Sequence, residues 1–195
     1  MIRLFVALAL PDSVAESLLA LQSGVPGARW MTREQLHVTL RFIGEVDGRD
    51  ANAIDETLAA ISAPRFTLDL KGVGAFGGKN PRALWAGVAA NDTLIHLQRK
   101  IESAIQRLGF PAEERKYTPH VTLARLRAAP AGRVMDYLAD HALYASGPFE
   151  ANAFALFSSH LSPNGSVYVA EREYLLNLKE KVICRNSIQP PERRH

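Results

Sequence analysis

The stretch His37-Val38-Thr39-Leu40 recurs unchanged as His120-Val121-Thr122-Leu123 in the second half of the chain. Each copy lies in a β-rich run, residues 36–43 and 121–126, that predicts a strand. Because side chains alternate between the two faces of a strand, histidine and threonine share one face while valine and leucine share the other. The valine and leucine face suits a core. Two equivalent strands would therefore present two imidazoles and two hydroxyls to one polar groove.

The residues around the two copies predict a mixture of strands and helices. Further strands are expected at residues 4–10, 66–70, 83–88, 153–158 and 167–176. Helices are expected from Pro11-Asp12-Ser13 onward and at residues 50–61, 92–108 and 134–143, the third capped by Asn91 or Asp92 and ended by Gly109. Short hairpin connections favour an α+β fold with largely antiparallel sheets over a doubly wound parallel sheet.

The glycine-rich segment Gly72-Val73-Gly74-Ala75-Phe76-Gly77 has the spacing of a dinucleotide-binding loop. A loop of that kind opens a helix, whereas the residues that follow this segment predict another strand. We therefore expect the segment to form a mobile hairpin connection at the rim of the cleft.

Length and composition place the chain among ordinary globular proteins. It has 195 residues, of which 47% are hydrophobic and 22% are charged. The single cysteine, Cys184, excludes an internal disulfide and a zinc site built from cysteine pairs. No stretch approaches the roughly 20 apolar residues that cross a membrane. We expect a cytoplasmic monomer that is not bound to a membrane.

The charge is unevenly distributed along the chain. Lys and Arg number 23 and Asp and Glu number 20, which gives a net charge of +3. The whole excess lies in residues 179–195, because residues 1–178 hold equal numbers of basic and acidic side chains. We expect residues 1–178 to form one bilobal domain and residues 179–195 a basic, flexible tail. Recognition of nucleic acid would then depend on local donors more than on a broad basic surface.

Two histidines and two threonines on one groove match the needs of phosphodiester cleavage. One imidazole can take a proton from the nucleophile and the other can give one to the leaving oxygen, since the ordinary pKa of histidine is about 6.5. Threonine hydroxyls can donate hydrogen bonds to the phosphate oxygens, and this chemistry needs no metal ion or cofactor. Two other interpretations remain: a structural duplication without catalysis, and a metal site with His160 as a third imidazole ligand.

Residues beyond the two copies also match a known family. They are Arg3-Leu4-Phe5-Val6-Ala7-Leu8, the flanks of the copies from Leu36 to Glu45 and from Pro119 to Arg125, the segment from Pro81 to Val88, and Ser159-His160-Leu161 with Gly165 and Tyr168. Through these residues the sequence resembles the 2H phosphoesterase superfamily. Within it, the sequence is most similar to the bacterial and archaeal RNA 2′,3′-cyclic phosphodiesterases, also called 2′-5′ RNA ligases. The resemblance covers nearly all of residues 1–178.

This resemblance implies a bilobal, pseudo-two-fold fold with two largely antiparallel sheets flanked by helices around a central cleft. It implies metal-independent hydrolysis of an RNA 2′,3′-cyclic phosphate end to a 2′-phosphate, with His37 as proton donor and His120 as proton acceptor. Thr39, Thr122 and Arg125 would bind the phosphate. The implied partner is RNA, tRNA fragments included, or a nucleotide. Attack by a 5′-hydroxyl in place of water would give reversible 2′-5′ ligation.

Alternation of side chains places Arg125 on the face opposite His120 and Thr122, unless the strand bulges there. The same alternation places Arg41 on the face of His37 and Thr39. We nevertheless assign phosphate binding to Arg125 and a salt-bridged or solvated role to Arg41. Two other functions stay open: a nucleotide- or RNA-binding module without catalysis, and a phosphodiesterase for another small cyclic phosphate.

Overall fold

The described part of the chain, residues 1–162 and 165–177 of this computed structural model, contains strands, four α-helices and one 3₁₀ turn. The strands are β1 (Ile2–Ala9), β2 (Ala28–Trp30), β3 (His37–Val46), β4 (Phe66–Leu68), β5 (Leu70–Phe76), β6 (Ala83–Val88), β7 (His120–Leu126), β8 (Phe149–Ala151), β9 (Ala153–Ser162) and β10 (Gly165–Leu175). The helices are α1 (Asp12–Leu19), α2 (Gly48–Ala59), α3 (Asp92–Arg107) and α4 (Ala131–Asp140), with the 3₁₀ turn at Arg33–Gln35. The expected tail, residues 179–195, lies outside the described residues.

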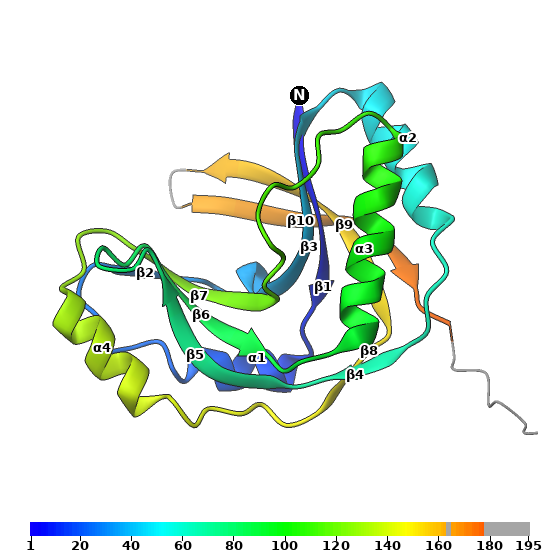
Figure 1. Cartoon of the computed structure of the whole chain (residues 1–195). Helices are drawn as coiled ribbons and strands as arrows, with labels where there is room; N and C mark the ends of the chain where they lie inside the picture. The colour runs from blue at the N-terminus through cyan, green and yellow to red at the C-terminus, as the bar shows by residue number, and fades with distance from the viewer. Residues whose placement is uncertain (163–164, 178–195) are drawn as a thin grey trace, which may run out of the picture.

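One antiparallel, curled sheet forms the body of the molecule (Figure 1). Its eight strands run in the order β10-β9-β1-β3-β7-β6-β5, with β2 paired to β7. β4 and β8 form a separate two-stranded sheet. Helix α3 packs against β3 and α2. Within these described residues, no helix combines the length and apolar character needed to cross a membrane.

The two copies of the repeated tetrapeptide meet at the centre of the main sheet. β3 and β7 pair through Val38 and Val121, which occupy the same place in their copies. Pairing of equivalent residues across an antiparallel ladder places a local two-fold axis between them. Outside this central pair, β1 flanks β3 and β6 flanks β7. The repeat in the sequence thus appears in the structure as a two-fold repeat of strand pairs.

The α+β class is confirmed, whereas the expected division into two main sheets is wrong. The division fails because β3 and β7 pair directly, so that both halves of the chain share one sheet. The single strand expected at residues 66–70 is also divided. Residues 66–68 pair with β8 in the small sheet, and Leu70 begins β5 of the main sheet.

The glycine-rich segment that we expected to be a mobile connection belongs mostly to a strand. Residues 70–76 form β5, and the turn toward β6 begins at Gly77, whose φ of 109° favours glycine. Gly74 lies opposite Trp85 in the ladder, where a Cβ atom would overlap the indole ring. This glycine therefore allows an aromatic side chain to lie against the strand, a role that the sequence pattern does not distinguish from a loop.

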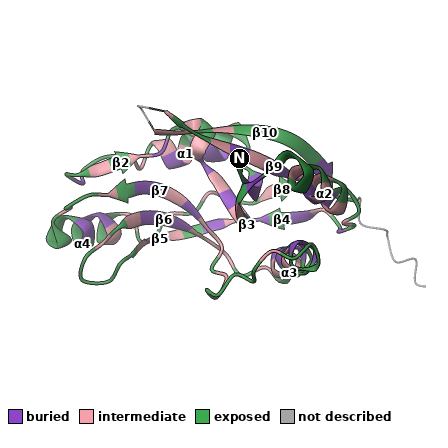
Figure 2. Cartoon of the chain, turned by 90° about the horizontal axis from the view of Figure 1, so that it is seen from above, coloured by how far each residue is buried: buried purple, intermediate pink, exposed green. Residues whose placement is uncertain are grey.

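Apolar side chains of the strands and helices share one core, and Figure 2 shows the buried stretches along both. The valines and leucines of both tetrapeptides are buried, as their strand parity predicts. Helix α3 buries an apolar stripe that includes Leu94, Leu97 and Ile101. The side chain of Asn91 accepts a hydrogen bond from the backbone N–H of Leu94 at 2.9 Å, which confirms the expected cap.

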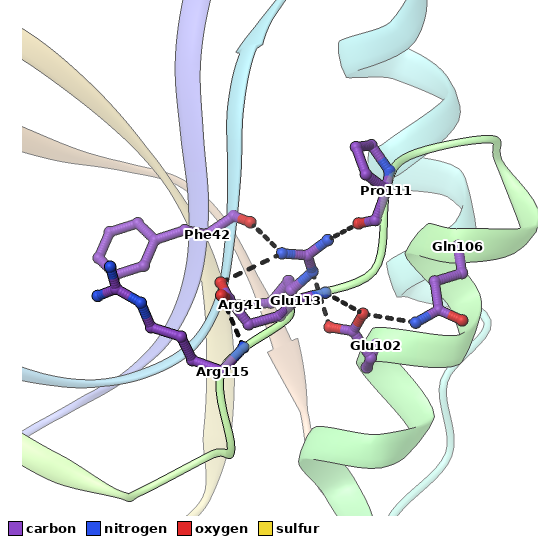
Figure 3. A network of polar contacts seen from close by, with 7 residues as sticks. All are labelled: Arg41, Phe42, Glu102, Gln106, Pro111, Glu113 and Arg115. Carbon is purple, nitrogen blue, oxygen red and sulfur yellow. Dashed lines mark hydrogen bonds and ion pairs between the residues drawn. The ribbon is translucent and has the colours of Figure 1, made fainter.

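A buried ion-pair network ties β3 to α3 and to the segment that follows this helix (Figure 3). Arg41 is 7% exposed, and its Nε lies 2.8 Å from Oε2 of Glu102. These two atoms form an ion pair, although they are not aligned for a hydrogen bond. Its Nη1 donates to the Phe42 carbonyl at 2.7 Å and lies 3.7 Å from the Glu113 carboxylate, while Nη2 donates to the Pro111 carbonyl. Arg41 therefore has the salt-bridged role that we assigned to it.

We predict that Arg41→Ala lowers the free energy of unfolding by about 3 kcal/mol, because it leaves two carboxylates without their shared cation. Urea denaturation at pH 7 measures the loss. The control is Arg3→Ala, which removes an exposed pair with Glu45 at 3.2 Å and should cost less than about 1 kcal/mol. Equal losses for the two variants would contradict a stabilising network.

Candidate active site

Both motif strands carry a β-bulge at the leucine of the tetrapeptide. In β3, Thr39 and Arg41 pair with adjacent residues of β1, so Leu40 is the extra residue. In β7, Thr122 and Ala124 pair with adjacent residues of β6, so Leu123 is extra. A bulge shifts the alternation of faces by one residue. The same irregularity therefore occurs at the same place in both halves.

These bulges decide which arginine can reach the site. After the bulge in β7, Ala124 is buried and Arg125 is exposed, on the face of His120 and Thr122. The bulge thus allows Arg125 to lie on this face, which strict alternation of side chains would not. In β3, the equivalent shift turns Arg41 into the core, so its expected parity with the first histidine is wrong.

The register of the central pair sets each histidine beside a threonine of the other strand. Val38 lies opposite Val121, and continuing this register by one residue places His37 opposite Thr122 and Thr39 opposite His120. The histidines and threonines are all partly exposed, whereas the residues between them are buried. The structure therefore brings both imidazoles and both hydroxyls to one face of the sheet.

The imidazole of His120 is held by a backbone carbonyl two residues before it in the chain. Nδ1 of His120 lies 2.7 Å from the Thr118 carbonyl oxygen, which can only accept, so this nitrogen donates. For His37, the backbone of Gln35, also two residues earlier, acts to raise the pKa of the imidazole. In a neutral imidazole with one nitrogen donating, the other nitrogen is left as the basic site. For His120, this leaves Nε2 able to accept a proton.

Aromatic rings surround both histidines. The centroid of His37 lies 4.9 Å from that of Phe5 and 5.4 Å from that of Tyr168. The centroid of His120 lies 4.9 Å from that of Phe76 and 6.3 Å from that of Trp85. These rings keep water from part of each imidazole and disfavour its charged form.

Both histidine pKa values are lowered in the free protein. Burial and, to a smaller extent, the charge of His120 lower the pKa of His37 from 6.5 to about 4, against the opposing effect of the Gln35 backbone. Burial also lowers the pKa of His120, again against the bond to its carbonyl partner. The two imidazoles are therefore close enough to influence one another, and both are neutral at pH 7.

A pocket of about 920 Å³ opens beside the paired histidines, between β3, the end of β5, α3 and the segment from residue 109 to 119. Of the five residues assigned to the site, Thr39 and His120 line it. The start of the turn after β5 also lines it, through Gly77 and Asn80, so the expected position of that turn at the cleft rim is confirmed.

Sequence reasoning missed two contributors to this site. The Tyr117 hydroxyl donates to the backbone carbonyl of Thr39 at 3.0 Å and thus fastens the segment before β7 to β3. Thr118 acts through its carbonyl, and a backbone group leaves no signal in the residue type. The position of Tyr117 just before the second copy was the available clue.

His160 does not join the pair. Its Nε2 lies 2.8 Å from the hydroxyl of the buried Ser158 on β9. Among residues 1–162 and 165–177, no three or more histidine, cysteine or acidic side chains gather in an arrangement that could hold a metal ion.

Comparison with known proteins assigns the family. The family model described as the 2′-5′ RNA ligase superfamily matches residues 10–162. The chain belongs to this superfamily.

Among curated relatives, an Archaeoglobus fulgidus protein named RNA 2′,3′-cyclic phosphodiesterase is 32% identical over 170 residues, which cover 85% of this chain and 96% of that protein. An Aeropyrum pernix protein of the same name is 35% identical over 164 residues, which cover 82% of this chain and 88% of that protein.

Solved structures show the same fold. A Thermus thermophilus protein superposes with a TM-score of 0.77 and 26% identity, covering 91% of this chain and 100% of that one. E. coli LigT complexed with 3′-AMP superposes with a TM-score of 0.75 and 25% identity, covering 90% of this chain and 98% of LigT.

The lowered pKa of His37 predicts that acid destabilises the protein. Between pH 6.5 and about 4, the unfolded chain binds a proton at this residue that the native state does not bind. The free energy of unfolding should therefore fall as the pH falls through this range, by up to about 3 kcal/mol from this residue, at about 1.4 kcal/mol per pKa unit.

Urea denaturation at pH 7 and pH 4.5 tests this for the wild type and for His37→Gln. The variant should lose less stability than the wild type on acidification, while His96→Gln, which alters an exposed histidine of α3, should lose as much as the wild type. If His37→Gln and the wild type lose the same amount, the burial of a neutral imidazole is not the cause.

Proposed function

We propose that this protein hydrolyses the 2′,3′-cyclic phosphate at the end of an RNA chain to a 2′-phosphate, without a metal ion. The observation that carries the proposal is the pair of histidines on one face of two paired, equivalent strands, with His120 held through a backbone carbonyl. Such a pair supplies the acid and the base that opening a cyclic phosphodiester needs. The curated relatives named RNA 2′,3′-cyclic phosphodiesterase support the same substrate.

The proposed reaction proceeds in one displacement. Nε2 of His120 takes a proton from water as the water oxygen attacks phosphorus. The bond between phosphorus and the 3′ oxygen breaks, and His37 gives a proton to that oxygen. The products are a 2′-phosphate and a 3′-hydroxyl, and a proton then returns from His120 through solvent to His37. Attack by a 5′-hydroxyl in place of water would form a 2′-5′ phosphodiester by the same transfers.

Substrate binding would favour the protonated form of His37, which its role as proton donor requires. In the free protein its pKa of about 4 leaves the ring neutral at pH 7. A cyclic phosphate carries a negative charge, and an anion close to an imidazole favours its protonated form. The substrate would therefore raise the pKa of the residue that must donate to it. Proton uptake on binding is a consequence of this mechanism.

The remaining assigned residues would hold the phosphate. The hydroxyls of Thr39 and Thr122 would donate hydrogen bonds to its non-bridging oxygens, where negative charge gathers in the transition state. Arg125 would add a positive charge from the exposed position that the bulge in β7 provides. In E. coli LigT complexed with 3′-AMP, a related chain holds a nucleotide, which fits a ligand of this size.

We predict that the wild type hydrolyses a nucleoside 2′,3′-cyclic phosphate in the presence of EDTA and yields the 2′-phosphate. His37→Ala and His120→Ala should each lower kcat by about 10²- to 10⁴-fold, the range that one acid or base contributes. Phosphorus NMR or ion-exchange chromatography identifies and quantifies the product. His96→Ala is the matched control.

An inactive wild type under these conditions, or full activity in either histidine variant, would refute the mechanism. A product that is wholly 3′-phosphate would reverse only the choice of the broken bond. Binding of a 2′-phosphonucleotide without turnover would instead favour a binding module. A higher kcat/KM for ADP-ribose 1″,2″-cyclic phosphate than for RNA ends would favour another cyclic phosphate as the substrate.

We predict that Arg125→Ala lowers kcat/KM about 10-fold. This loss corresponds to the lower end of the range of about 1.5–3 kcal/mol that a hydrogen bond to a charged group contributes. Arg125→Lys should recover part of the loss because it restores the charge. Arg127→Ala, two residues further along at another exposed position, is the control. An unchanged kcat/KM in Arg125→Ala would remove this arginine from the site.

A further inference from the structure

One dipeptide, Tyr117-Thr118, contacts both copies of the repeated tetrapeptide. The Tyr117 hydroxyl donates to the backbone carbonyl of Thr39, in the first copy, at 3.0 Å. The Thr118 carbonyl accepts from Nδ1 of His120, in the second copy, at 2.7 Å. A side-chain bond and a backbone bond therefore join the two halves of the site within two residues of the chain. A displacement of this dipeptide would alter both halves.

The direction of the Thr118 carbonyl depends on the residues on either side of it. On one side is Pro119, whose ring fixes its own φ and restricts Thr118 to extended backbone. The Pro119 carbonyl also accepts from the backbone N–H of Val88 on β6 at 3.2 Å. On the other side is Tyr117, which its hydroxyl fastens to β3. The carbonyl that holds His120 thus lies between two anchors, one on each strand that neighbours β7.

The Tyr117 hydroxyl binds β3 at an irregular point of its ladder. The Thr39 carbonyl belongs to the peptide that leads into Leu40, the extra residue of the bulge in β3. A bulge disrupts the ladder locally and leaves its extra residue unpaired. A hydrogen bond from outside the ladder therefore stabilises the backbone where the ladder holds it least. The Tyr117 hydroxyl supports the bulge in β3 as well as the dipeptide before β7.

The surroundings of Tyr117 keep its hydroxyl a donor. The ring packs against the core, and burial raises the pKa of the hydroxyl above its ordinary value of 10.0. The phenol therefore carries its proton at neutral pH. Because the Thr39 carbonyl can only accept, the bond has a fixed polarity.

We propose that Tyr117 is a positioning residue that acts through the Thr118 carbonyl to hold His120 in the tautomer and orientation of a base. This inference rests on the proposed function, in which Nε2 of His120 accepts a proton from water. In the neutral ring, a fixed donor bond at Nδ1 leaves Nε2 without hydrogen. Without the hydroxyl, the dipeptide loses one of its two anchors, and the ring also populates the tautomer with hydrogen on Nε2. That tautomer cannot accept a proton at Nε2.

The first test is kinetic and uses Tyr117→Phe, which keeps the aromatic ring and removes only the hydroxyl. We expect kcat for a nucleoside 2′,3′-cyclic phosphate to fall about 3- to 10-fold, the equivalent of one hydrogen bond. KM should stay within about twofold of the wild-type value, because the hydroxyl binds protein backbone and not substrate.

The second test is nitrogen-15 NMR of the imidazoles, which does not depend on turnover. In neutral wild-type His120, Nδ1 should carry hydrogen and Nε2 should not, whereas Tyr117→Phe should show both tautomers. Burial lowers the pKa of His120, and the bond to the Thr118 carbonyl opposes this effect. A weakened bond should therefore lower the pKa of His120 below its wild-type value. A general loss of stability would change neither the tautomer nor the pKa of the folded protein.

The matched control is Tyr144→Phe. Tyr144 also packs at the edge of the core, and its hydroxyl pairs with that of Ser17 in α1 at 2.8 Å. This variant loses the same kind of bond at another place, so it should keep the wild-type kcat and the wild-type spectrum of His120. Equal losses of kcat in the two variants would reject a positioning role for Tyr117.

The proposal is overturned if Tyr117→Phe keeps the tautomer and the pKa of wild-type His120, or keeps kcat in an active enzyme. Hydrogen on Nε2 of neutral wild-type His120 would overturn it without any variant. If the wild type does not hydrolyse the cyclic phosphate, the proposed function fails, and the NMR measurement still decides whether Tyr117 positions His120. Dispersed amide signals from the same samples show whether each variant is folded.

Discussion

The pairing of β3 with β7 is the constraint on which the site depends. Each histidine directly precedes the valine that forms this pair, so a single register fixes both imidazoles on one face of the sheet. A slip of either strand by one residue would turn its histidine to the buried face, among apolar side chains. The burial of the four valines and leucines opposes such a slip, since their apolar side chains would then be exposed to water. Core packing thus specifies the geometry of the polar face.

Much of this arrangement could be predicted from the sequence, because it follows from alternation and repetition. The two copies identified the motif strands, the polar face and the α+β class. The sharing of one sheet could not be predicted, since a strand pattern does not specify its neighbour. The bulges escaped detection for a similar reason: Leu40 and Leu123 are ordinary buried leucines, and only their pairing partners show them to be extra residues. The placement of Arg41 and Arg125 depended on that missing information.

Charge acts in this protein through position more than through number. Residues 1–178 are electrically balanced by count, yet the acidic residues of the pocket are paired with a buried arginine, while other cations on its walls have no ion-pair partner in the part of the chain that the structure describes. Local potential can therefore be positive at the site although the net charge of residues 1–178 is zero. The lowered histidine pKa values belong to the same pattern, because neutral imidazoles add no positive charge to the groove of the free protein.

The bulges in β3 and β7 occupy equivalent positions, but the residues that they turn to the polar face are of different types. The residue that follows each bulge by two positions is returned to the polar face, and it is an aromatic ring in β3 and a guanidinium in β7: Phe42 and Arg125. A symmetric groove would accept a ligand in either of two orientations related by the axis. With an aromatic ring on one side and a cation on the other, the two orientations differ in energy. The duplicated fold therefore distinguishes the two orientations of a ligand that its two-fold axis alone would make equivalent.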